Sequence, residues 1–167
     1  MWTRRGVVGA GAVAAAGAAV GSGAWVASEP PAAGRYCLTA PECQTVAALG
    51  EALFPGHYVP VAPEEVGLVG TVDRIAWDTL DPVRRMGFRG VLRSLELGTL
   101  ASRGRRFSAL EVTERRAVLQ AWSQPDPASR RIAYDSLLAV LAMAYYGDPL
   151  VRARLGWSPG CAVKGAT

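Results

Sequence analysis

Residues 136–146 read SLLAVLAMAYY, and a helix drawn through them is apolar on every side. A helix of this kind is buried all round, either at the centre of a bundle or beneath another chain. We expect it to begin near Pro127 and to end at Tyr146, because Gly147 follows as a helix stop. The pair Asp148-Pro149 then predicts a short further helix that runs to Leu155.

Helix-start patterns recur along the rest of the chain. Asp-Pro pairs also stand at residues 81–82 and 126–127, where the aspartate can accept hydrogen bonds from free backbone N–H groups and the proline suits the first helical position. One capping box is predicted at Thr39 with Glu42. A second is predicted at Ser108 with Glu111, and Glu111 is also placed to pair with Arg115.

The sequence predicts an all-α fold, a compact bundle of about six helices that follows an N-terminal signal segment. Downstream of that segment, no run of four to eight β-branched or aromatic residues is bounded by turns, so no strand is expected. The chain of 167 residues, half of them apolar, suffices for one core. The expected helices cover residues 40–53, 66–80, 82–100 with interruptions at Gly87 and Gly90, the stretch from the second capping box to residue 122, 127–146 and 149–155.

The N-terminal stretch, residues 3–27, reads TRRGVVGAGAVAAAGAAVGSGAWVA. Its glycines have the spacing of a dinucleotide-binding turn, but such a turn needs a parallel sheet, which the chain does not offer. A basic start, a mildly apolar middle and small residues at a cleavage site are instead typical of an export signal, with cleavage after Ala24 or after Ser28. We expect residues 1–28 to be this signal, 29–38 a linker and 39–167 the helical domain.

The start of this stretch, Thr3 to Val8, resembles the twin-arginine (Tat) class of export signals. Arg4 and Arg5 can each make a paired hydrogen bond with a carboxylate of the Tat translocase, which lysine cannot copy. A plain membrane anchor is the alternative, because the 22 residues from Gly6 to Ala27 could span a bilayer. The resemblance implies export of a folded protein to the periplasm or another extracytoplasmic space, with membrane association if the segment is retained.

The side chains do not predict a catalytic or metal site. His57 is the single histidine, and it has no evident partner with which to activate a nucleophile. The formal net charge of +4 includes Arg4 and Arg5, and the remainder is too small to indicate nucleic acid as a partner. On the helix expected at residues 82–100, arginines recur every four residues and form a basic stripe, which is either a solvated face or a surface for an acidic partner; its members are Arg85, Arg89 and Arg93.

Three cysteines leave their pairing open. In an oxidising compartment Cys37 could bond with Cys43, or either of them with Cys161. The odd cysteine would be free or bonded to a partner. Three cysteines at these spacings do not make a zinc or iron-sulfur site.

The end of the long helix and the short helix after it carry a family resemblance. Together with the stretches around residues 39–56 and 107–122, they resemble the gluconate 2-dehydrogenase subunit 3 family, the small subunit of periplasmic flavin-dependent sugar dehydrogenases. The resemblance extends from Leu38 to Trp157. The residues that carry it most directly are Tyr145, Tyr146, Gly147, Asp148, Pro149, Leu155, Gly156 and Trp157.

The resemblance implies a non-catalytic subunit that binds no cofactor itself. A large catalytic subunit would hold FAD, and the small subunit would stabilise it and escort it through the Tat translocase. The resemblance also implies a separate cytochrome c subunit through which electrons leave; such a subunit needs the CxxCH pattern of haem attachment, which this sequence does not contain. An exported enzyme with an unrecognised cofactor and a membrane-anchored adaptor are the alternatives. The candidate contacts with a partner are Arg85, Arg89, Arg93, Tyr145, Tyr146 and Trp157.

Overall fold

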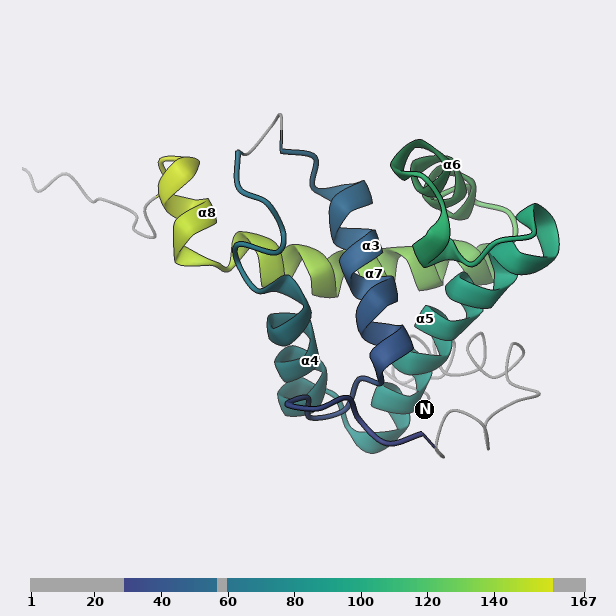
Figure 1. Ribbon diagram of the computed structural model, residues 1–167, viewed down its shortest axis with the longest axis horizontal. Helices are drawn as coiled ribbons and strands as arrows, with labels where there is room; N and C mark the ends of the chain where they lie inside the picture. The colour runs from purple at the N-terminus through teal and green to yellow at the C-terminus, as the bar shows by residue number, and fades with distance from the viewer. Residues whose placement is uncertain (1–28, 57–59, 158–167) are drawn as a thin grey trace, which may run out of the picture.

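The computed structural model describes residues 29–56 and 60–157. Within these ranges the fold is entirely helical and contains no strand, so the prediction of an all-α fold with six helices is confirmed (Figure 1). Arg4, Arg5, His57 and Cys161 lie outside the described residues. The elements are α3 (Ala40–Leu53), α4 (Leu68–Thr79), α5 (Pro82–Arg103), the 3-10 helix η1 (Phe107–Ala109), α6 (Val112–Trp122), α7 (Ala128–Tyr146) and α8 (Pro149–Arg154).

Two helices organise the packing. α7 runs along the long axis of the molecule and packs against α4, α5 and α6 (Figure 1). α3 crosses the direction of α7 and packs against α4, α5, α6 and η1. The core between them contains Leu49, Leu92, Leu95, Phe107, Leu137 and Leu141, all of them almost fully buried. None of the described helices is both long and apolar enough to cross a bilayer.

Only one face of α7 is buried, which corrects the prediction of a helix buried all round. Leu137, Leu141 and Tyr145 follow one another by four residues and point into the core. On the other side Met143 is 59% exposed and Tyr146 is 46% exposed. The reason is that the neighbours of α7 within this chain cover a single side. A place at the centre of a bundle is therefore wrong, whereas a place beneath another chain stays a prediction.

Several predicted helix starts are confirmed. The Glu42 carboxylate accepts a hydrogen bond from the Thr39 backbone N–H at 2.9 Å, as expected for the capping box of α3. Asp81 caps α5 by accepting from the Arg84 N–H at 2.9 Å. Asp148 caps α8 in the same way. These local patterns define the helix starts because each of them satisfies backbone donors that a first turn leaves free.

The second capping box was predicted one turn too early. The box is formed by Glu111 and Glu114, and the Glu111 N–H donates to the Glu114 carboxylate at 3.1 Å. Ser108 lies instead in η1, where its backbone N–H and its hydroxyl donate to the buried Glu96 carboxylate. Arg115 pairs with Glu51 of α3 and not with Glu111.

Several other helix boundaries differ from the prediction. α4 covers Leu68–Thr79 where residues 66–80 were expected, and α8 ends at Arg154, one residue early. Pro127 occupies the N-cap of α7, so the helix starts one residue later than expected and Asp126 is not its cap.

α5 runs unbroken through Gly87 and Gly90, because Phe88 and other core residues on its inner face hold it in place. It continues past the expected end at residue 100 to Arg103, and Gly104, whose φ of +69° suits a helix C-cap, follows it.

Candidate docking surface

The basic stripe on α5 is turned toward the inside of the molecule. The Nε atoms of Arg89 and Arg93 lie 2.9 and 2.8 Å from the carboxylate of Glu42, which is 2% exposed. Glu42 also caps α3, so one buried carboxylate joins the start of α3 to the middle of α5. Arg93 also reaches Glu29 at 2.9 Å, near the point where the described chain begins.

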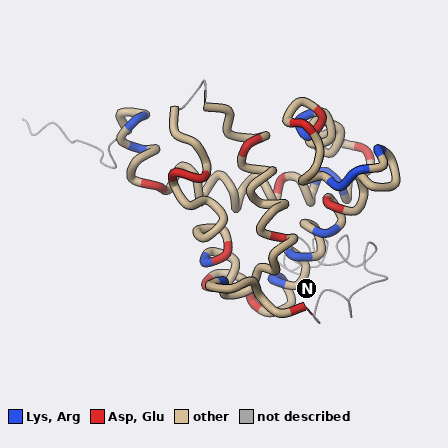
Figure 2. The backbone as a smooth tube through the Cα atoms, in the orientation of Figure 1, with Lys and Arg blue, Asp and Glu red and all other residues tan. Residues whose placement is uncertain are grey.

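Arg85, the first arginine of the stripe, caps the end of α4. Its guanidinium donates to the carbonyl oxygens of Ala76, Trp77 and Leu80. It also lies 4.1 Å from the centre of the Trp77 ring, a cation–π contact. The stripe is therefore not a solvated face, and its arginines are engaged within the chain. On the other described elements, Arg residues alternate along the chain with Asp and Glu (Figure 2).

Asp73 fixes the segment before α3, and sequence reasoning missed it. Its carboxylate accepts from the backbone N–H groups of Tyr36, Cys37 and Leu38 at 2.7, 3.0 and 2.9 Å. Burial alone would raise the pKa of Asp73, but these hydrogen bonds outweigh it and lower the pKa below its ordinary value. The backbone of residues 36–38, expected in a linker, is thus bound to α4, and the side chains of Cys37 and Leu38 are buried. In the sequence, a single aspartate beside apolar helix positions gives no pattern that predicts these hydrogen bonds to residues 36–38.

The two described cysteines are free thiols, so the candidate Cys37–Cys43 disulfide is not formed. The Cys37 thiol donates to the Asp73 carboxylate at 3.3 Å. Burial and this neighbouring carboxylate raise the pKa of Cys37 to about 12, and burial also raises the pKa of Cys43. Thiols with a raised pKa are poor nucleophiles. Pairing with Cys161 stays a prediction, because that residue lies outside the described ranges.

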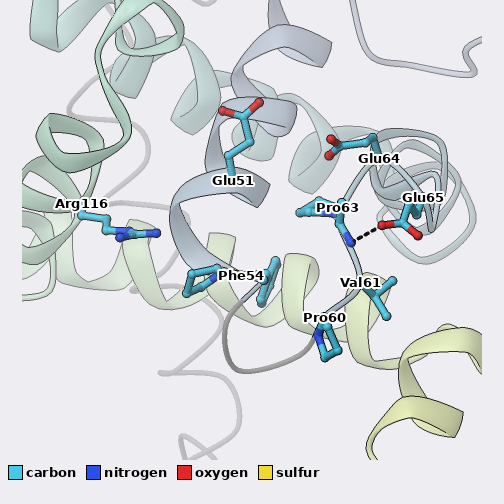
Figure 3. A pocket seen from close by; sticks show the side chains of 11 residues that line it. Glu51, Phe54, Pro60, Val61, Pro63, Glu64, Glu65 and Arg116 are labelled. Carbon is cyan, nitrogen blue, oxygen red and sulfur yellow. Dashed lines mark hydrogen bonds between the residues drawn. The ribbon is translucent and has the colours of Figure 1, made fainter.

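An open hollow of about 470 Å³ lies between the end of α3 and the chain that leads into α4 (Figure 3). Phe54, Val61 and several prolines line it, and Glu51, Glu64 and Glu65 add carboxylates. Arg116 donates to the Ala52 carbonyl, and Glu65 accepts from the Ala62 N–H. Among the residues that the structure describes, the lining contains no serine, cysteine or histidine.

No group of three or more potential metal ligands occurs among residues 29–56 and 60–157. The other buried acid, Glu96, accepts from Thr45 and from Ser108 and joins α5 to α3 and η1. The buried carboxylates that the structure describes therefore serve the packing of helices. The exposed apolar surface of the described residues offers a further candidate site.

Tyr145 belongs to the core and not to that surface. It is 1% exposed, and its ring stacks on Phe54 with centroids 4.3 Å apart and an interplanar angle of 4°. Its hydroxyl donates to the Val61 carbonyl at 2.7 Å. Burial raises the pKa of Tyr145, with smaller contributions from Tyr146 and Glu65. Of the three aromatic residues proposed for partner contact, Tyr145 is thus enclosed by its own chain.

Tyr146 and Trp157, the other two candidates, are 46% and 55% exposed. Tyr146 meets Phe54 and Tyr145 edge to face, with centroids 5.7 and 5.2 Å away, so the cluster beneath supports its ring. Arg152 lies over the Trp157 ring at 5.6 Å. Further large apolar side chains are exposed on the end of α7 and on the short helix α8 and the residues that follow it. We name this the α7–α8 surface; its members are Met143, Tyr146, Leu150, Leu155 and Trp157.

Comparison with known proteins supports the family resemblance. The model of the family described as gluconate 2-dehydrogenase subunit 3 matches residues 40–161, which include every described helix. Comparisons with curated proteins and with solved structures gave no match. The family match covers more than half of the chain, from the start of α3 to beyond α8. The chain therefore belongs to the gluconate 2-dehydrogenase subunit 3 family.

Proposed function

We propose that this chain is the non-catalytic small subunit of a flavin-dependent sugar or polyol dehydrogenase, and that it binds the large FAD-containing subunit through the α7–α8 surface. The observation that carries the proposal is the exposure of Met143 and Tyr146 at the C-terminal end of α7 in a member of a dehydrogenase subunit family. The first half of the exposed side of α7 is mostly polar, whereas a second protein would bury the apolar end.

The geometry of Tyr146 suits an interface anchor. Its ring is already held by Phe54 and Tyr145, so little rotamer freedom remains to be lost on binding. Tyrosine and tryptophan are also enriched among the residues that dominate binding energy, and both occur on this surface.

The export role extends the proposal to residues 1–28. The twin-arginine pattern would carry the small subunit through the Tat translocase, and a folded flavoprotein bound to it would follow without a signal of its own. The chain would act as an escort during export and as a stabiliser of the catalytic subunit afterwards. A separate cytochrome c subunit would take the electrons from FAD.

Co-purification of a larger flavoprotein tests the docking surface. We expect Met143→Ser combined with Tyr146→Ser to lower recovery of the flavoprotein by about tenfold or more, because each truncation removes a large apolar contact. The matched control is Leu97→Ser with Leu100→Ser, which changes two leucines of α5 that are 52% and 46% exposed. Equal recovery with both variants would reject this surface, and turnover by the chain alone would reject the non-catalytic role.

A further inference from the structure

The start of the described chain lies at the lower edge of the molecule in Figure 1. Residues 29–38 run along this edge, where the end of α4 meets the beginning of α5. Four large side chains are exposed on these segments, and together we name them the end surface: Tyr36 at 55%, Trp77 at 44%, Val83 at 59% and Met86 at 42%.

The aromatic side chains of the end surface contact one another and a neighbouring arginine. Tyr36 stacks with Trp77, with centroids 6.2 Å apart and an interplanar angle of 24°. Arg85 lies against the Trp77 ring at 4.1 Å and is itself fixed by carbonyls at the end of α4. Tryptophan and tyrosine favour the headgroup region of a bilayer, because an apolar ring is combined with a polar edge.

The charges around the end surface are nearly balanced. Arg74 and Arg84 are exposed there, and so are Asp78 and Asp81. Arg84 also pairs with Asp81 at 3.3 Å. This composition favours shallow insertion of apolar side chains into the interface over attraction of a polybasic patch to anionic lipid.

The start of the described chain bears on the occupant of this surface. The described chain begins at Glu29, which is paired with Arg93 in the middle of α5, and residues 29–38 lead from there along this edge. The apolar stretch at residues 6–27 of the sequence is long enough for a bilayer. A membrane that held this stretch would lie near the start of the described chain. α8 lies at the upper left of Figure 1, away from this edge, so it stays accessible to a partner.

We propose that the end surface rests on a lipid bilayer, with Tyr36, Trp77, Val83 and Met86 at headgroup level, while residues 1–28 are held at the membrane. The inference rests on the export role in the proposed function, and it is independent of the identity of the catalytic subunit. The body would then present one end to the membrane and the α7–α8 surface to its cargo.

Vesicle binding by the full-length chain tests the proposal. Vesicles of phosphatidylcholine with a minor share of phosphatidylglycerol are mixed with the wild type, with Val83→Ser/Met86→Ser, and with Leu97→Ser/Leu100→Ser as the matched control on the same helix. We expect the first variant to bind about tenfold more weakly and the control to bind like the wild type. Equal binding by all three proteins would overturn the proposal, since residues 1–28 would then account for all of it.

Fluorescence gives a second, local readout. In a Trp2→Phe/Trp25→Phe background, we expect brominated phosphatidylcholine to quench the tryptophan emission, and Trp77→Phe to remove that quenching. Unchanged quenching after Trp77→Phe would contradict insertion. Self-association in vesicle-free solution that Val83→Ser/Met86→Ser abolishes would also overturn the proposal, because a second copy would then cover this end. Flavoprotein recovery, measured with the same variants, is expected to stay unchanged, so failure here is distinguishable from failure of the docking surface.

Discussion

The buried carboxylate of Asp73 by itself binds the segment before α3 to α4. Three consecutive backbone N–H groups and the Cys37 thiol donate to it, and it is 1% exposed. Without it, the segment that leads into α3 would have unpaired backbone donors in the core. The segment before α3 is therefore stabilised by one side chain of α4.

Replacement of Asp73 by asparagine tests this role. An amide offers one acceptor oxygen and turns its N–H₂ group toward other donors, so we expect the free energy of unfolding to fall by about 2–3 kcal/mol. Urea unfolding followed by circular dichroism measures the change. Asp78→Asn is the control, because Asp78 is exposed on the same helix and its replacement should be nearly neutral.

The same residue gives a pH dependence with a definite sign. The pKa of Asp73 is lower in the folded state than its ordinary value of 3.8, so its stabilisation is present above that value and is lost as the pH falls through the folded pKa. We expect the wild type to lose its advantage over Asp73→Asn in this acid range. A constant difference between the two proteins from pH 6 down to acid unfolding would contradict this expectation.

At the scale of the elements, α5 is attached to α3 through charge as well as through the core. Glu42 at the start of α3 binds both Arg89 and Arg93, whose side chains are 13% and 17% exposed. Removal of one member of a buried ion pair is strongly destabilising, because the remaining charge is then buried without a partner. The glycines of α5 do not interrupt the helix because these pairs and the core face hold both of its halves.

Glu42→Gln tests the attachment of α5. Loss of the carboxylate leaves two guanidinium groups close together and largely buried, so we expect a loss of about 3–5 kcal/mol in the free energy of unfolding. Thermal unfolding measures the change. In Asp135→Asn the broken pair with Arg131 is about half exposed, and the loss should stay below about 1 kcal/mol. A similar loss of unfolding free energy in both variants would show that the buried pairs of Glu42 stabilise the fold no more than the exposed pair does.

At the scale of the whole molecule, the α7–α8 surface and the end surface lie at different places on the described body. The α7–α8 surface includes the end of the long helix, and the end surface lies where residues 29–38 meet α4 and α5. Two separate regions suit a protein that is held at one end and carries a partner at another.

Export of the partner tests this organisation. We expect Arg4→Lys combined with Arg5→Lys to keep both the small subunit and the flavoprotein in the cytoplasm, because lysine cannot make the paired hydrogen bonds of arginine. Cell fractionation followed by flavin fluorescence and immunoblotting measures the distribution. The tandem substitution Arg130→Lys/Arg131→Lys on α7 is the control and should leave export unchanged. Continued export of the flavoprotein with the Arg4/Arg5 variant would refute the escort role.

The sequence alone determined the all-α fold and the starts of α3, α5 and α8, because helix caps and periodicity are local properties of a few neighbouring residues. It also carried the family resemblance, which the family match supports.

Only the tertiary structure decided where the side chains of those helices point. The arginine stripe turns inward because a carboxylate 47 residues away in the chain is buried beside it. Tyr145 is enclosed while Tyr146 next to it is exposed, because α7 has neighbours on one side only. Such contacts depend on which helices meet, and the pattern within one helix does not contain that information.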